Sequence, residues 1–309
     1  MGTAIEINGL KKKYGDFWAL KDVNMKVEQG KIYGFLGKNG AGKTTTIRII
    51  LKQIKATEGN IRIFGMDESQ YRNMTGQLIG SIVEVPAAYQ NLSGYENLLI
   101  SAQLHGKDSK EITSTLKKVG LSENLKRKVK KYSLGMKQRL GIAMAIIHNP
   151  KILILDEPIN GLDPKGIKEM RDLFTMLSRE YGMTIMISSH ILSEIQQTVD
   201  VVGIIDEGKM IGEYAVDDLG AQGQEWLILE TDNNVKTKQI LENLGKRFQN
   251  EVENKIRVKC TKEENVDINR KLIQAGIGIY NSASFGGNLE EVFLKLTEAE
   301  NSVKTEAVA

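Results

Sequence analysis

Apolar side chains alternate with polar ones over the first 36 residues, which is the pattern of paired β-strands with one buried face. The alternation is clearest in three runs, residues 4–7, 23–27 and 31–36. A glycine-rich stretch at 37–42 follows, and residues 44–52 then have helical spacing. The pattern predicts strands that lead through a glycine loop into a helix.

The middle of the chain, from about residue 92 to residue 148, changes to helical spacing. Beyond it come two short, wholly apolar runs at 152–155 and 184–188, with a helix expected at 165–180 between them. Such runs are typical of strands that are buried on both faces of a parallel sheet. Further strands are expected at 61–64, 79–85, 201–205 and 209–212.

The last part of the chain has its own pattern after a plausible linker at 217–224. Runs typical of strands alternate there with runs typical of helices: 226–231, 255–260 and 277–281 against 235–246, 265–274 and 289–297. We therefore predict an α/β protein with two domains. Residues 1–220 form the main domain, with a mostly parallel core sheet, an antiparallel β subdomain and a helical subdomain at about 92–148. Residues 225–309 form a small α+β domain.

Composition narrows the class of protein. The chain has 309 residues, of which 41% are hydrophobic and 26% charged, so a wholly disordered chain is excluded. The single cysteine, Cys260, excludes an intramolecular disulfide and fits a reducing cytosol. A net charge of +3 predicts no nucleic-acid partner, and the basic run at 126–131 is interpreted as a solvated loop.

Membrane-spanning and signal segments are not expected. No apolar stretch approaches the roughly 18–20 residues that span a bilayer. The first residues lack the charged-then-apolar order of a signal peptide. If the protein acts at a membrane, other chains must bring it there.

Residues 37–44 fit the phosphate-binding pattern G-x-x-x-x-G-K-[ST] without a mismatch. The loop comprises Gly37, Lys38, Asn39, Gly40, Ala41, Gly42, Lys43 and Thr44, and Thr45 follows in the helix. Its glycines let backbone N–H groups approach phosphate oxygens, and the helix adds its positive end. Lys43 supplies a cation for the β and γ phosphates, and the Thr44 hydroxyl completes a magnesium shell. We predict that the chain binds ATP and Mg²⁺ in a P-loop NTPase fold.

Two carboxylates end the apolar run at 152–155. Asp156 lies at the carboxyl end of a core strand, where ligands bind in open α/β sheets, and is expected to hold magnesium. Glu157 is expected to polarise the attacking water as general base. His190 follows the next core strand and is expected to reach the γ-phosphate. The alternatives are surface acids and a structural histidine, and His105 and His148 are interpreted as structural.

Residues 132–139 are similar to the LSGGQ signature of ABC-transporter nucleotide-binding subunits, and the resemblance extends over residues 4–215. In that family the signature of one subunit closes over ATP held by the other. Ser133 and Gly135 keep the positions that contact the γ-phosphate, whereas Leu134 replaces a glycine and Met136 a glutamine. The resemblance implies a head-to-tail dimer in which these four residues act on the partner's nucleotide.

Other motifs follow in family order. Tyr14 looks like the aromatic residue that stacks on adenine. Asn160–Asp163 resembles the D-loop, with Asp163 expected to contact the opposite subunit. Glu84 stands where most relatives carry glutamine. A carboxylate can still bind magnesium, so Glu84 joins Thr44 and Asp156 as an expected metal ligand.

One branch of the family resembles this chain most in residues 80–98, 133–139 and 160–164 and in the tail at 289–296. This is the branch of bacitracin-resistance and lantibiotic-immunity ATPases, which pair with ABC-2 permeases. The resemblance implies an ATPase that drives export of a peptide antibiotic from the cytoplasmic face of the membrane. The permease, not this chain, would handle the peptide.

Other functions stay open at this point. An exporter subunit for another substrate, such as a lipid or a drug, fits the same motifs. A soluble ABC protein of translation would carry two cassettes, and one of DNA repair would carry a long coiled coil between loop and signature; this chain has neither. A regulator without turnover is disfavoured by the intact Glu157 and His190.

Overall fold

The computed structural model describes residues 2–84, 87–124, 126–191, 195–216, 225–246, 248–250 and 255–285. The chain divides into two compact units, Met1–Ala215 and Val216–Ala309. Among the helices of the described ranges, none combines the length and the apolar character needed to cross a bilayer.

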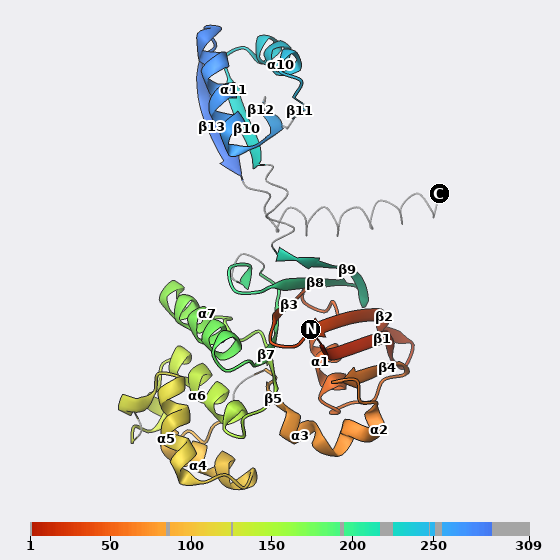
Figure 1. The fold of residues 1–309 in the computed structure, drawn as a ribbon, viewed down its shortest axis with the longest axis vertical. Helices are drawn as coiled ribbons and strands as arrows, with labels where there is room; N and C mark the ends of the chain where they lie inside the picture. Colours follow the sequence, from red (N-terminus) through yellow and green to blue (C-terminus); the bar gives the residue numbers. More distant parts are fainter. Residues whose placement is uncertain are drawn as a thin grey trace. The chain divides into compact units, whose positions relative to one another are not determined.

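A nine-stranded sheet organises the first unit (Figure 1), in the order β4-β1-β2-β9-β8-β3-β7-β6-β5. The neighbours of β3, β7 and β6 run parallel to them. The strand β1 pairs antiparallel with β2 and β4, β9 pairs antiparallel with β8, and β2 joins β9 in parallel. The strands are β1 (Thr3–Tyr14), β2 (Phe17–Glu28), β3 (Ile32–Leu36), β4 (Glu58–Ile63), β5 (Ile79–Ile82), β6 (Ile152–Asp156), β7 (Thr184–Ser189), β8 (Val201–Asp206) and β9 (Lys209–Ala215). The central strands β3, β6 and β7 are buried along their whole length, which explains the apolar runs at 152–155 and 184–188. The single buried face expected at residues 31–36 is wrong, because β3 lies inside the sheet between β8 and β7.

Helices of the first unit fall into separate groups. The helix α1 follows β3, and α4, α5 and α6 gather together away from the antiparallel strands (Figure 1). The helices are α1 (Lys43–Ile50), α2 (Glu68–Tyr71), α3 (Thr75–Leu78), α4 (Gly94–Leu104), α5 (Ser109–Lys118), α6 (Leu134–Ile146) and α7 (Pro164–Arg179). Caps fix their starts: Ser93 and Glu96 form a capping box on α4, and Ser133 caps α6.

The second unit is a four-stranded antiparallel sheet in the order β11-β12-β10-β13. Its elements are β10 (Glu225–Thr231), α10 (Asn234–Asn243), β11 (Phe248–Asn250), β12 (Lys255–Cys260), α11 (Lys262–Gln274) and β13 (Ile279–Phe285). Alternate residues of β10 and β12 share one core with the helices, so both helices cover the same face of the sheet. This is the β-α-β-β-α-β arrangement of ferredoxin-like domains.

The predicted α/β fold with a mostly parallel core sheet is confirmed, with differences at element ends. The strand expected at 79–85 ends at Ile82, because the backbone turns away at Glu84, which has φ 64°. The structure adds the short helices α2 and α3 and the strand β11, which the periodicity did not predict. The linker expected at 217–224 and the helix expected at 289–297 lie outside the described residues.

Candidate nucleotide-binding site

The glycine loop connects β3 to α1 and depends on the absence of side chains at two positions. Gly42 has φ 113°, and a Cβ there would lie 2.5 Å from Cδ2 of Leu20. A Cβ on Gly37 would lie 2.4 Å from the carbonyl oxygen of Ile205. A side chain at position 37 would require a backbone shift, and at position 42 the left-handed backbone would strain any residue that has a side chain, which explains why both are glycine.

Lys43 lies inside this loop with only 5% of its side chain exposed. Its ammonium group donates a hydrogen bond of 2.6 Å to the Gly37 carbonyl oxygen and lies 3.3 Å from Oε1 of Glu157. A buried cation needs such partners because water does not solvate it. An ion pair between Lys43 and Glu157 therefore links the phosphate loop to the residue that follows β6.

Asp156 ends β6 and is 4% exposed. Its Oδ2 accepts a 2.8 Å hydrogen bond from the Thr44 hydroxyl, and its Oδ1 accepts one from the Ser188 hydroxyl on β7. Each donor comes from a different element, because β6, β7 and α1 meet at the carboxyl edge of the sheet. The result is a cluster of hard oxygen atoms beside Lys43.

Glu157 follows directly in a left-handed backbone conformation, with φ 51°. Its N–H donates a 3.0 Å hydrogen bond to the Ser188 hydroxyl, and its Oε2 lies 2.8 Å from Nδ1 of His190. Positive φ is uncommon for a residue with a side chain and persists where the surroundings impose it. The turn directs the Glu157 carboxylate between Lys43 and His190.

Tyr14 closes the other side of the loop. With Phe17 and Ala19 it lines a hollow whose remaining walls come from the phosphate loop and Glu157. The expected contact residues Asn39, Gly40, Gly42, Lys43, Thr44 and Thr45 line this hollow, whereas Ala41 is buried in the core. The ammonium group of Lys12 lies over the Tyr14 ring, 4.8 Å from its centroid. Because Tyr14 is still 48% exposed, a planar ligand can stack on the exposed part of the ring.

Glu84 lines a second hollow together with Thr44, Asp156 and Glu157. The structure thus brings all three expected metal ligands to one place. The carboxylate of Glu84 is paired with Arg48, which lies on α1 one turn after Thr44. Arg48 would therefore compete with a metal ion for the Glu84 carboxylate.

The signature residues Ser133, Leu134, Gly135 and Met136 line a third hollow together with Asp163. This hollow shares no residue with the one that contains the phosphate loop. The Asp163 side chain accepts a hydrogen bond from the N–H of Gly166 and caps α7. Leu134 also lines the hollow of Thr44, Asp156 and Glu157, whereas Ser133 and Gly135 line neither that hollow nor the one that contains the phosphate loop.

Comparison with known proteins identifies this arrangement. Residues 20–160 match the family described as "ABC transporter". The chain is 46% identical over 299 residues to the bacitracin transport ATP-binding protein BcrA of Bacillus licheniformis, covering 96% of this chain and 98% of that protein. The chain belongs to the ABC transporter family. Its prediction as an ATP-binding, ATP-hydrolysing subunit is confirmed.

Other ABC proteins agree with this placement. The lantibiotic transport ATP-binding protein SrtF of Streptococcus pyogenes is 48% identical over 213 residues, 69% of this chain and 91% of that protein. Among solved structures, cbiO1 from Clostridium perfringens, part of the ABC transporter complex cbiONQ, is 26% identical with a TM-score of 0.67. The alignment covers 79% of this chain and 98% of that one.

Three residues that the ABC motifs did not single out belong to the site. Ser188 holds both Asp156 and the backbone of Glu157, Arg48 holds Glu84, and Phe17 lines the hollow with Tyr14. A spacing of four residues places Arg48 and Thr44 on one face of α1, which sequence alone could have indicated. Ser188 stands opposite Asp156 in the β6–β7 register, which only the sheet shows.

Proposed function

We propose that this chain is the motor of an exporter that removes a peptide antibiotic, such as bacitracin or a lantibiotic. Two of its relatives bear names that state transport of these two classes of compound, and one of them matches along nearly its whole length. The chain would work at the cytoplasmic face of the membrane with integral permease subunits of the ABC-2 type. The permease would contact the peptide.

One observation carries the catalytic proposal: Lys43, Thr44, Asp156, Glu157 and His190 converge at the carboxyl ends of β6 and β7. Lys43 would neutralise the β and γ phosphates of ATP. Glu157 would orient and polarise the water that attacks the γ-phosphate, and His190 would hold the Glu157 carboxylate in place. Tyr14 would stack on the adenine ring.

The same edge suits Mg²⁺. The Thr44 hydroxyl and the Asp156 carboxylate lie 2.8 Å apart, and such hard oxygen donors are the ligands that magnesium prefers. Thr44 and Asp156 would hold the ion, and Glu84 would join them once it leaves Arg48. A bound magnesium ion neutralises charge on the phosphate oxygens.

Hydrolysis would require two copies of the chain. Because Ser133 and Gly135 line neither the phosphate-loop hollow nor the hollow of Glu84, a head-to-tail dimer with two-fold symmetry would place them against the partner's ATP. ATP would favour this closed state by binding it more tightly than the open one. Asp163, beside the signature, would lie at the subunit boundary.

The permease is proposed to dock on the segment that follows Glu84, residues 85–95. Tyr89 in this segment is 62% exposed, although its backbone is fixed by hydrogen bonds to the Asn97 side chain. A rigidly held, exposed aromatic residue is typical of a protein interface. A permease that is docked on this segment would move with it when the ATPase dimer closes.

Co-purification tests the proposal. The chain is coexpressed with candidate ABC-2 permease genes, as wild type, as Tyr89→Asp and as the control Tyr280→Asp, which alters a more exposed tyrosine of the second unit. We expect the wild type and the control to co-purify with the permease and to raise resistance to bacitracin or a lantibiotic. Tyr89→Asp should lose both while its thermal unfolding is unchanged. Full resistance in Tyr89→Asp would contradict the docking site, and no resistance in any strain would contradict the substrate class.

A further inference from the structure

Five exposed cations stand together in the run 126–131, which lies between α5 and α6 (Figure 1). They are Lys126, Arg127, Lys128, Lys130 and Lys131. The whole chain has a net charge of +3 and this run contributes five positive charges, so the remaining residues together are net negative. Positive charge is therefore concentrated at one place on the chain.

The backbone of this run is fixed, unlike that of a freely solvated loop. Val129, at its centre, is completely buried. Its N–H donates a hydrogen bond of 2.9 Å to the carbonyl oxygen of Leu92, and the N–H of Lys130 donates one of 2.9 Å to that of Gln90. A partner that binds the cations would meet a preformed surface, which lowers the entropy cost of binding.

The cations of the run are not neutralised inside the chain. Within the ranges that the structure describes, none of the five forms an ion pair. Hydrogen bonds from Ser93 lower the pKa of Glu96, and the charge of Lys128 lowers it further. That carboxylate is held by the backbone N–H and the hydroxyl of Ser93, where it caps α4. The run therefore keeps its charge for a partner outside the chain.

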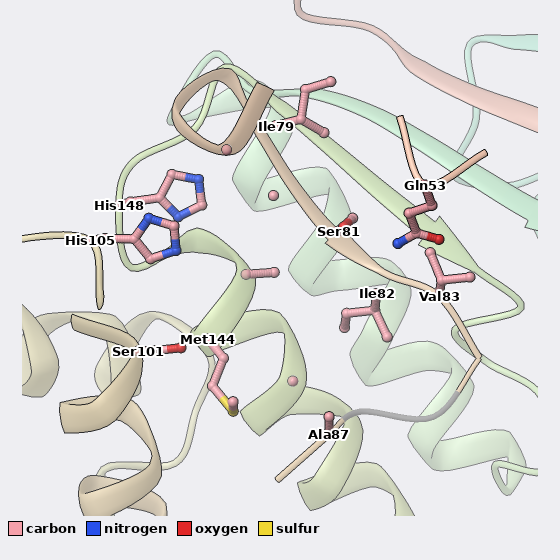
Figure 2. A pocket seen from close by; sticks show the side chains of 14 residues that line it. Gln53, Ile79, Ser81, Ile82, Val83, Ala87, Ser101, His105, Met144 and His148 are labelled. Atoms are coloured by element: carbon pink, nitrogen blue, oxygen red, sulfur yellow. The ribbon is translucent and has the colours of Figure 1, made fainter. Parts of the chain in front are cut away.

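The contacts with Gln90 and Leu92 place the basic run beside the segment 85–95, on which the permease is proposed to dock. A surface that receives an integral membrane protein faces the membrane. On its other side, Ala87 of this segment lines a hollow that no lysine, arginine or carboxylate lines among the described residues. The ionisable side chains there are the stacked His105 and His148 (Figure 2), and burial lowers the pKa of His148 to about 4. A cationic surface beside the docking segment therefore comes from the run 126–131 and not from this hollow.

We propose that the run 126–131 binds the anionic phospholipid headgroups of the membrane that holds the permease. The orientation toward the membrane rests on the proposed docking of a permease, whereas binding to lipid is a property of this chain alone. Each cation close to an anionic membrane surface strengthens partitioning about fivefold, so five of them give a reversible attachment that salt screens. The attachment presents the docking segment to the permease and confines the search for it to the membrane plane. Nucleic acid matches less well, because Tyr132 beside the run is buried and leaves no ring free for base stacking.

Cosedimentation of the full-length chain with lipid vesicles, without permease or nucleotide, tests the proposal. We expect the chain to bind vesicles of phosphatidylglycerol and phosphatidylcholine, to release them at high salt, and to ignore vesicles of phosphatidylcholine alone. Lys130→Gln/Lys131→Gln should weaken partitioning about 30-fold with unchanged thermal unfolding, and Lys130→Arg/Lys131→Arg should retain it. The matched control, Lys110→Gln/Lys117→Gln, removes the same charge from two exposed lysines of α5. Its partitioning should stay within about threefold of wild type, because charge outside the contact is screened.

The outcomes separate lipid binding from the alternatives. Equal losses in the two glutamine variants would overturn the proposal, since net charge alone would then set the binding, and so would equal binding to both kinds of vesicle. If Lys130→Gln/Lys131→Gln bound anionic vesicles as the wild type does but no longer co-purified with the permease, the run would serve an acidic protein segment and the lipid contact would be wrong. Failure in the vesicle assay leaves the proposed function intact, because no permease takes part in it. Normal vesicle binding without co-purification of any permease would contradict the proposed function instead.

Discussion

Replacement of Glu157 by glutamine tests the residue that contacts both Lys43 and His190. The carboxylate lies 3.3 Å from the Lys43 ammonium group and 2.8 Å from Nδ1 of His190. Glutamine keeps the size of the side chain and removes its charge and basicity. The water that attacks the γ-phosphate would lose its base, whereas the phosphate loop, built from backbone and Lys43, would stay intact.

The magnitude follows from two separate effects. Loss of a general base costs on the order of 10²–10⁴ in rate, or about 3–5 kcal/mol of transition-state stabilisation. The Lys43–Glu157 attraction at 3.3 Å has a gross Coulomb energy of about 5 kcal/mol at an effective dielectric constant of 20. ATP must replace that attraction when it draws Lys43 to its phosphates. Glu157→Gln should therefore bind ATP at least as tightly as the wild type while turning over far more slowly.

The assay combines single-turnover hydrolysis of radiolabelled ATP with equilibrium binding of a fluorescent ATP analogue. Glu180→Gln is the matched control, since it makes the same change at an exposed residue just beyond α7. Wild-type kinetics are expected for the control and a slow, tightly binding enzyme for Glu157→Gln. Turnover of Glu157→Gln within about threefold of the control would refute the assignment of the base.

Three further outcomes are expected. Glu157→Gln should sediment as a dimer with saturating ATP and as a monomer without it; a monomer in both conditions would argue against the head-to-tail site. Glu84→Ala should raise the magnesium concentration needed for half-maximal hydrolysis, and Glu84→Gln should not, whereas identical magnesium titrations would show that the pair with Arg48 keeps Glu84 away from the ion. The pKa of His148 is lowered from 6.5 to about 4, so its neutral form stabilises the fold above pH 6.5 and that stability is lost as the pH falls toward 4. In His148→Phe, the free energy of unfolding measured in urea should depend less on pH between 6.5 and 4. An unchanged pH dependence would contradict the burial of the His148 ring.

The sequence by itself predicted those parts of the protein that depend on interactions within one short segment. A loop such as Gly37–Thr44 must combine glycines with a lysine to hold phosphates, so its residues predict its chemistry. The apolar run 152–155 predicted a strand buried on both faces, and the two carboxylates behind it fell at the end where ligands bind. Interrupted alternation was harder to interpret: β1 extends over Thr3–Tyr14 because bulges shift its register with β2, and only residues 4–7 showed the pattern.

Only the tertiary structure decided which distant residues meet. Ser188 supports Asp156 because β6 and β7 are neighbours in a particular register. Arg48 reaches Glu84 because the backbone leaves β5 in a left-handed turn. His105 and His148, interpreted from the sequence as structural, stack because α4 and α6 end side by side. Contacts of this kind depend on packing between elements far apart in the chain, and the order of residues along one segment carries no record of them.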